Sequence, residues 1–459
     1  MRTTTMSFLK AIVRLLAGGR RPGAERGATR ELEGTALKGA GVFLVRYGVG
    51  FILNFSGSVV VARLLGPRFW GLYAISYFIL TLHTLISLGV WGYLVRSPRE
   101  PGPKEIQTCF TLQHVIGALG ALLTIFVVAP SLSRYFGDEA LTPLVRGAGV
   151  GGYFYCWRWT ALALAERRMD YRKPAAAELL DIFVFNLCAV AGVFLGHGVW
   201  GLTLGNALRG ATSALYSHFT ISRRVGLGWD LGALRGIARF APAYLAFTLL
   251  QWLPVHAGPV LVGFLVNAQA LGYVQLAYRI LEYPRVLVTL TFRVGMSAYS
   301  KLQDQPLALN DLVQRSLNLL YWLIAPTIAL MAALSPWWVP AVYGRAWLPM
   351  VDVMFLLAVP FMVTAGYTVL ATALSAKGDV KEAALFQAAY NALYWLAAFV
   401  LIPKLKHLGL PAAEWAALAA GGILLWEYRR RCAPLSPKGI AVKLAICSAA
   451  LALAWRLAH

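Results

Sequence analysis

Several arginines of this 459-residue chain lie inside apolar stretches that are long enough to cross a membrane. A charged side chain at that depth usually faces a water-filled cavity or a partner of opposite charge. Guanidinium groups bind phosphate oxygens two at a time, so arginines around one cavity could hold an anion that carries phosphate. The candidate substrate-binding residues are Arg46, Arg158, Arg209 and Arg279, with Glu282 three residues after Arg279.

Each of these residues has an alternative, purely structural role. Arg279 could pair with Glu282 on the same helix face, whereas Arg46 and Arg158 could extend their side chains to the cytoplasmic headgroups. We favour anion binding for Arg279, which lies too deep to reach the headgroups easily, and for Arg46. For Arg158 and Arg209 we favour the structural role.

Membrane-spanning helices must position these residues. Hydrophobic residues make up 59% of the chain and charged residues 14%. Crossing about 30 Å of hydrocarbon takes about 20 apolar residues per helix. The apolar stretches are too long for barrel strands and do not alternate, so we predict an all-α membrane protein. Twelve spans are expected, at residues 40–62, 72–95, 106–129, 142–165, 177–195, 199–221, 240–264, 272–295, 316–335, 351–374, 383–402 and 408–426, and 439–457 is apolar enough to be a thirteenth.

The basic residues fall mainly in every second gap between these spans, for example Arg167 and Arg168, and Arg429 to Arg431. Positive charge is retained on the cytoplasmic side of membranes. We therefore expect a multi-pass membrane protein with a cytoplasmic N-terminus, and the resemblance described below implies the bacterial inner membrane. The formal charge of +22 has the same cause, so no nucleic-acid partner is expected.

Two short patterns each occur twice. The segment 65–73, followed by Tyr77, is echoed by 266–273, followed by Tyr278, and Phe136-Gly137 is echoed by Tyr343-Gly344. Each pair is six spans apart, which predicts two parallel six-helix bundles around a central cationic cavity. The expected domains are a cytoplasmic basic segment at 1–38, an N-lobe at 39–222, a C-lobe at 236–427 and an extra hydrophobic helix at 438–458.

Residues 61–73, Val-Ala-Arg-Leu-Leu-Gly-Pro-Arg-Phe-Trp-Gly-Leu-Tyr, carry a family resemblance, and weaker echoes occur at 136–138, 165–171 and 278–284. Over roughly residues 40–426 the chain resembles the bacterial polysaccharide flippases. Their superfamily also contains the lipid II flippases and the multidrug and toxin extruders.

The resemblance implies twelve to fourteen helices in two six-helix lobes with a cationic cavity. It implies as substrate a sugar unit linked to undecaprenyl pyrophosphate, moved from the cytoplasmic to the periplasmic leaflet. Arg279 matches the eighth-helix arginine that serves the pyrophosphate in lipid II flippases. The first-helix arginines of those flippases are not matched, because Phe51 and Gly57 stand there, so lipid II is a less favoured cargo.

We therefore expect a flippase rather than an enzyme, acting in O-antigen, lipopolysaccharide, capsule or exopolysaccharide assembly. Membrane lipid and the polymerase or ligase of such a pathway are its candidate partners. An ion gradient could supply energy, with H⁺ or Na⁺ as the coupling ion. No phosphate-binding loop of the ATPase type occurs, and the five cysteines lie singly, so neither cofactor nor metal is expected.

Three alternatives remain. A drug or cation antiporter of the same superfamily would need a buried carboxylate, and none is evident from the sequence. A membrane glycosyltransferase or polymer ligase would need a sizeable extramembrane loop with carboxylate or metal-binding chemistry, and the longest gaps offer only Asp304 and Asp311. A scaffold that transports nothing is the third.

Overall fold

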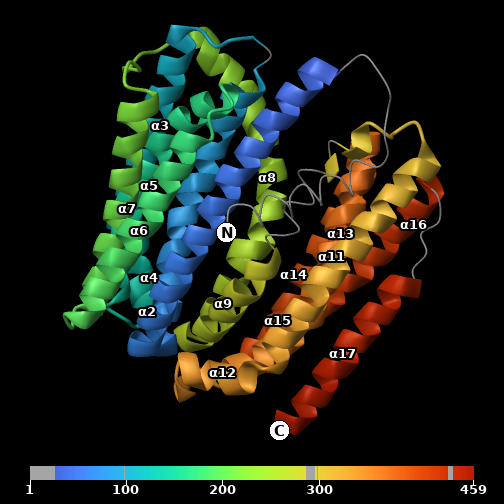
Figure 1. Cartoon of the computed structure of the whole chain (residues 1–459). Helices are drawn as coiled ribbons and strands as arrows, with labels where there is room; N and C mark the ends of the chain where they lie inside the picture. The colour runs from blue at the N-terminus through green and yellow to red at the C-terminus, as the bar shows by residue number, and fades with distance from the viewer. Residues whose placement is uncertain (1–25, 98, 286–294, 297, 433–437, 459) are drawn as a thin grey trace. The chain divides into compact units, whose positions relative to one another are not determined.

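The computed structural model describes residues 26–97, 99–285, 295–296, 298–432 and 438–458 (Figure 1). Every regular element in these ranges is a helix, as predicted. The chain divides into two compact units, Glu25–Gly272 and Tyr273–His459. Each unit is described here by itself.

The N-terminal unit is a bundle of long helices in which α6 and α7 pack together and α5 lies against both α2 and α7 (Figure 1). A five-residue π segment, η1, joins α3 to α4. Its helices are α2 (Arg26–Arg96), α3 (Pro103–Leu123), η1 (Thr124–Val128), α4 (Ala129–Phe136), α5 (Leu141–Arg167), α6 (Arg172–Phe194), α7 (Gly198–Ile221), α8 (Leu231–Leu265) and the first turn of α9 (Ala268–Glu282).

The C-terminal unit contains the rest of α9 and the helices that follow it. Within it α14 packs against α15, and α11 packs against α13 and α17. The elements are η2 (Tyr283–Arg285), α11 (Pro306–Ala333), α12 (Ser335–Val342), η3 (Arg345–Trp347), α13 (Pro349–Lys377), α14 (Val380–Leu405), η4 (Lys406–Leu408), α15 (Gly409–Ala417), η5 (Leu418–Ala420), α16 (Gly421–Arg431) and α17 (Lys438–Ala458).

Seven helical segments among the described residues are long and apolar enough to cross a membrane. Two of them, Gly48–Arg96 with 49 residues and Val380–Arg431 with 52, measure roughly 75 Å at about 1.5 Å per residue. That length is more than twice the hydrocarbon thickness of about 30 Å. Each of these two segments can therefore cross twice, and the chain is a multi-pass membrane protein.

Helix α2 contains the break that the sequence predicts between the first two spans. Gly66 has φ 79° and ψ 177°, and Pro67 follows it. Glycine tolerates this positive φ, and proline lacks the N–H that would continue the helix. The described residues of the thirteen apolar stretches lie mainly on helices, and the stretch 272–295 is described only at 272–285 and 295. The count of spans and the central cavity stay predictions.

Some boundaries differ from the predicted ones for clear reasons. Helix α8 begins nine residues early because Asp230 caps it, accepting a hydrogen bond of 2.7 Å from the Ala233 N–H. Helix α9 ends at Glu282 and passes into a 3₁₀ turn that contains Pro284, whereas the predicted eighth span continues to residue 295. Residues 286–294 lie outside the described residues.

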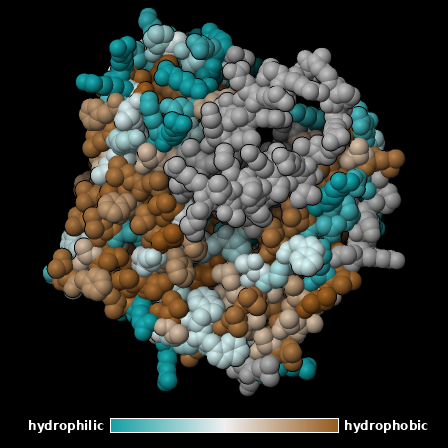
Figure 2. Space-filling view, viewed as in Figure 1, coloured by the Kyte–Doolittle hydropathy of each residue, from teal (hydrophilic) through white to brown (hydrophobic). Residues whose placement is uncertain are grey.

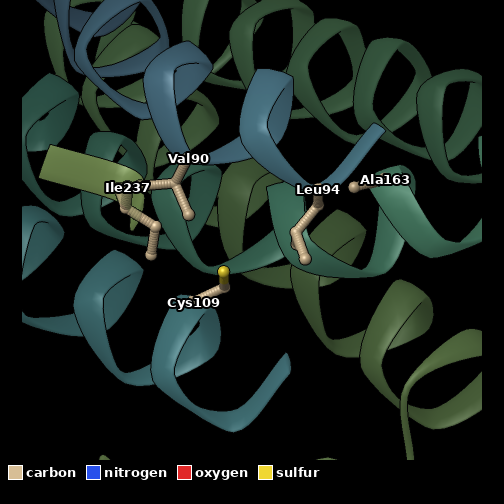
Figure 3. Close-up of a cluster of buried hydrophobic side chains, with 5 residues drawn as sticks. All are labelled: Val90, Leu94, Cys109, Ala163 and Ile237. Atoms are coloured by element: carbon tan, nitrogen blue, oxygen red, sulfur yellow. The ribbon is translucent and has the colours of Figure 1, made fainter. Parts of the chain in front are cut away.

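Helix α8 packs on the N-terminal helices. Its Ile237 joins a buried cluster with Val90 and Leu94 of α2, Cys109 of α3 and Ala163 of α5 (Figure 3). The same helix carries prolines at 242, 254 and 259. The compact unit therefore extends further along the chain than the predicted N-lobe, whose boundary was taken from the repeat and remains a prediction.

One repeated pattern has the same local structure in both halves of the chain. Helix α4 and helix α12 each contain eight residues. Gly137 follows the first with φ 62°, and Gly344 lies two residues after the second with φ 99°. A left-handed residue after a helix favours glycine, which has no Cβ to clash.

The other pattern brings its two copies together within the N-terminal unit. A Cβ added to Gly71 would collide with the carbonyl oxygen of Ala268, and one added to Gly272 would collide with the carbonyl oxygen of Pro67. Pro67 precedes Gly71 by four residues, as Ala268 precedes Gly272. The contact is therefore reciprocal, as in an isologous interface between two copies of one surface.

Candidate functional site

The N-terminal unit buries a cluster of charged side chains around Asp181 of α6. Arg158 Nη1 on α5 donates to Asp181 Oδ2 over 3.1 Å, and Arg209 Nε on α7 donates to Asp181 Oδ1 over 2.5 Å. The hydroxyl of Tyr155 also donates to Asp181. The side chains of the two arginines are only 11% and 12% exposed. Three neighbouring helices thus bring two guanidinium groups to one carboxylate.

Close packing of α5 on α7 brings Arg158 and Arg209 near enough to share Asp181. A Cβ added to Gly210 of α7 would lie 2.6 Å from the carbonyl oxygen of Gly151 on α5. Small residues allow helix backbones to approach in a membrane. Gly210 is adjacent to Arg209, and Gly151 lies two turns before Arg158, so this approach sets the distance between the two arginines.

The cluster carries more positive than negative charge. Arg158 also donates to Ser213 Oγ over 2.7 Å, and its guanidinium carbon lies 4.1 Å from the centre of the Tyr155 ring. The guanidinium carbon of Arg209 lies 4.8 Å from the centre of the Phe185 ring. Within the part of the chain that is described, the buried Nε of Arg158 has no acceptor. The arginines therefore retain capacity to bind an anion.

The sequence analysis singled out these two arginines but not the carboxylate that joins them. Asp181 falls near the start of the predicted fifth span, 177–195, and its residue is only 4% exposed. Its position one turn after Glu178 was the available signal. Tyr155 was missed as well, because helix rotation, not residue type, brings it to Asp181.

Arg46, Arg279 and Glu282 are described separately from this cluster. Arg46 lies in α2, and its side chain is outside the described residues. Arg279 is half-buried on α9 in the C-terminal unit. Glu282 is 58% exposed and accepts from Arg285 Nη1 over 3.3 Å. A common cavity for Arg46, Arg158, Arg209 and Arg279 stays a prediction.

The C-terminal unit buries a second carboxylate that the sequence analysis missed. Glu414 of α15 is 8% exposed. It accepts a hydrogen bond of 3.0 Å from the Tyr278 hydroxyl and another from the Tyr390 hydroxyl. Glu414 lies near the start of the predicted span 408–426, three residues after Pro411, so its burial was not recognised from the sequence. The sequence expectation that the spans hold no buried carboxylate was therefore wrong.

Aromatic and charged groups surround the Glu414 site. The Tyr278 ring packs edge-on against Phe361 with 5.4 Å between ring centres. The guanidinium carbon of Arg285 lies 5.0 Å from the centre of the same Phe361 ring. Intramembrane carboxylates commonly mark ion or proton pathways. Among the described residues, no group of three or more His, Cys, Asp or Glu side chains could hold a metal ion.

Comparisons with known proteins identify a family and two relatives that this chain resembles. The family model described as polysaccharide biosynthesis protein matches residues 60–352. The lipopolysaccharide biosynthesis protein WzxC of Escherichia coli K12 is 21% identical over 304 residues, which is 65% of this chain and 61% of the relative. The teichuronic acid biosynthesis protein TuaB of Bacillus subtilis 168 is 20% identical over 304 residues, 65% of this chain and 62% of the relative. The chain thus spans about three fifths of the length of these relatives.

Solved structures share the fold. The lipid II flippase MurJ in an inward closed conformation aligns with a TM-score of 0.73 at 14% identity, covering 91% of this chain and 92% of its own. An inward-facing multidrug transporter of the MATE family aligns with a TM-score of 0.67 at 13% identity, covering 84% and 98%. At these identities the likeness establishes the architecture alone.

Proposed function

Because this chain belongs to the polysaccharide biosynthesis protein family, we propose that it is a flippase for an oligosaccharide linked to undecaprenyl pyrophosphate. It would move this lipid from the cytoplasmic to the periplasmic leaflet of the bacterial inner membrane by alternating access. The sugar unit would then pass to a polymerase or ligase for O-antigen, capsule or exopolysaccharide assembly.

The observation that carries the proposal is the pair of buried arginines that share Asp181. A diphosphate cannot enter hydrocarbon unless other groups replace its water, and guanidinium groups in a low-dielectric site do so well. The oxygen atoms of a diphosphate would compete with Asp181 for these donors and could accept from the Nε of Arg158. Arg279 would add a further contact, as the family resemblance implies.

A second candidate function is cation-coupled antiport. The buried Glu414, with hydroxyl donors from Tyr278 and Tyr390, favours it, because a carboxylate inside a membrane can bind a proton or a sodium ion. In the proposed flippase, an ion bound at Glu414 would be the coupling ion, H⁺ or Na⁺, for export of the lipid-linked sugar. In the second candidate function, a drug antiporter, the protein would instead export a cationic drug in exchange for that ion.

Reconstitution into vesicles tests the proposal. A fluorescent lipid-linked oligosaccharide is placed in both leaflets, and the protein is added in the presence or absence of an ion gradient. A flippase makes protected label accessible without a new glycosidic bond, while a glycosyltransferase or ligase forms such a bond. No change of either kind in a folded preparation would overturn the proposal, and uptake of a cationic dye without label movement would favour the antiporter.

Variants link the activity to the cluster. Arg158→Gln and Arg209→Gln should each reduce label movement at least tenfold, because removal of either arginine abolishes the excess of positive charge. Arg134→Gln is the matched control, because Arg134 is exposed on α4. Equal movement in all four proteins would show that the cluster only holds the helices together.

A further inference from the structure

An open pocket of about 610 Å³ lies on the N-terminal unit, between α3, α5, α7 and the segment 222–230. Its lining includes Phe110, His114, Trp157 and His218. Their rings contact in a closed series, with centre distances of 4.6 Å, 5.2 Å, 5.6 Å and 5.7 Å around the set. The pocket lining shares no residue with the Asp181 cluster, and the pocket plays no part in the proposed flipping.

The segment that closes one side of this pocket is fixed to α3. Thr111 Oγ1 donates to the Gly228 carbonyl over 3.0 Å and accepts from the Gly228 N–H over 2.9 Å. Thr108 Oγ1 accepts from the Asp230 N–H over 2.7 Å. The lining residues Val225, Gly226 and Leu227 are therefore held in place by the helix opposite.

The apolar side of the pocket continues along α3. Val115, which lines the pocket, is 39% exposed, and it is followed by the exposed Leu119, Leu122 and Phe126, at 63%, 52% and 68%. Spacings of four, three and four residues place these side chains on one helix face. Figure 2 shows that apolar side chains cover broad areas of the visible surface. The stripe from Val115 to Phe126 is roughly 17 Å long at about 1.5 Å per residue, and an acyl chain could lie along it.

Basic residues flank the pocket lining along the chain. Arg223 and Arg224 are exposed and directly precede the lining residue Val225. Neither forms an ion pair within the described ranges. Lys173 adds a third cation at this end, since its Nζ donates to the Thr220 carbonyl over 3.1 Å, although it also lies 3.7 Å from Asp170. Basic pockets between helices on the cytoplasmic side of a membrane protein suit lipid headgroups.

We propose that this pocket binds an anionic phospholipid of the surrounding bilayer. Arg223 and Arg224 contact the phosphate and glycerol headgroup, and one acyl chain enters beside Phe110 and Trp157 and continues over Val115 and Leu119. The charge of the rim selects an anionic lipid over a zwitterionic one. The four aromatic rings contact each other, so they offer the acyl chain a preformed apolar surface.

Native mass spectrometry of the full-length protein tests this site. The probes are phosphatidylglycerol and phosphatidylcholine with identical acyl chains. We expect phosphatidylglycerol to bind the wild-type protein about tenfold more tightly, and Arg223→Gln/Arg224→Gln to remove most of that preference. Arg429→Gln/Arg430→Gln is the matched control, because these two arginines form an exposed adjacent pair at the end of α16. A second variant, Ala118→Trp, narrows the pocket and should weaken the binding of both lipids.

Four results would overturn the proposal. The first is equal binding of the two lipids to the wild-type protein. The second is an unchanged preference in Arg223→Gln/Arg224→Gln. The third is displacement of phosphatidylglycerol from this pocket by an equal concentration of polyprenyl phosphate, which would assign the pocket to the transported lipid. Loss of the preference in the Arg429→Gln/Arg430→Gln control would also count against it, because any basic pair would then suffice.

Discussion

Gly71 and Gly272 each lie against the backbone of the other's segment: a side chain on Gly71 would strike Ala268, and one on Gly272 would strike Pro67. The two glycines occupy equivalent places in the repeated pattern at 65–73 and 266–273. The two copies of this pattern thus form, within one chain, a reciprocal contact like that between the subunits of a symmetric dimer.

This contact predicts that Gly71→Ala and Gly272→Ala are each destabilising. The new methyl group must push two helix ends apart, and such overpacking typically costs about 1–3 kcal/mol. Thermal unfolding of the purified protein in detergent should show a clearly lower melting temperature for each variant. Gly422→Ala is the control, because nothing lies within 4 Å of a Cβ at that position. Equal melting temperatures for all three variants would contradict the reciprocal contact.

Asp181→Asn should destabilise the protein more than either arginine substitution does. The change leaves two buried guanidinium groups without a carboxylate, and loss of one partner from a buried ion pair typically costs about 3–5 kcal/mol. Arg209→Gln should cost less, since Asp181 keeps Arg158 and the Tyr155 hydroxyl.

The two measurements together separate stability from transport. Urea or thermal unfolding reports the first effect, and movement of a labelled lipid-linked sugar reports the second. We expect the Arg209→Gln variant to be folded but to move the labelled lipid-linked sugar slowly. If it is folded and as fast as the wild-type protein, the excess charge of the cluster has no part in transport.

Glu414→Gln should retain the fold and lose ion coupling. The two hydroxyls donate to different carboxylate oxygens. The amide oxygen can still accept from one of them and the amide NH2 can donate to the other, but the side chain can no longer bind a proton. Label movement should therefore stop responding to a pH or sodium gradient. Glu414→Ala serves as the structural comparison, because it leaves two hydroxyl donors unpaired at about 1–3 kcal/mol each. An unaltered gradient response in Glu414→Gln would remove this residue from the coupling path.

Arg279→Ala should abolish complementation of a strain that lacks this protein while leaving membrane insertion intact. The reason is loss of a guanidinium contact to the diphosphate, as the family resemblance implies. Arg315→Ala is the control, since Arg315 is 59% exposed and pairs with Asp311 on the same helix over 2.7 Å. Normal polymer assembly in Arg279→Ala cells would exclude Arg279 from the site.

Much of the fold could be predicted from the sequence because membrane spans obey a simple length and composition rule. Gly66-Pro67 marked the break in α2, and Phe136-Gly137 and Tyr343-Gly344 marked equivalent turns. The family resemblance based on residues 61–73 is confirmed, since the matching family model begins at residue 60.

The buried clusters could not be predicted in the same way. Whether Asp181 meets Arg158 and Arg209 depends on how three helices rotate about their axes, and their apolar patterns have little periodicity to fix that rotation. Glu414 falls near the start of the predicted span 408–426, and the packing of α15 against α14 buries it. Pairing of Glu282 with Arg279 was the structural alternative to anion binding, and Glu282 accepts from Arg285, which the 3₁₀ turn at Pro284 places beside it.

The three prolines of α8 have a mechanical consequence. Each lacks the amide hydrogen that would tie it to the turn before, so Pro242, Pro254 and Pro259 leave three positions where the helix resists curvature least. This helix is the last that the chain completes before Gly272. We therefore expect strain along the polypeptide to be absorbed in part by bending of α8 at these three positions.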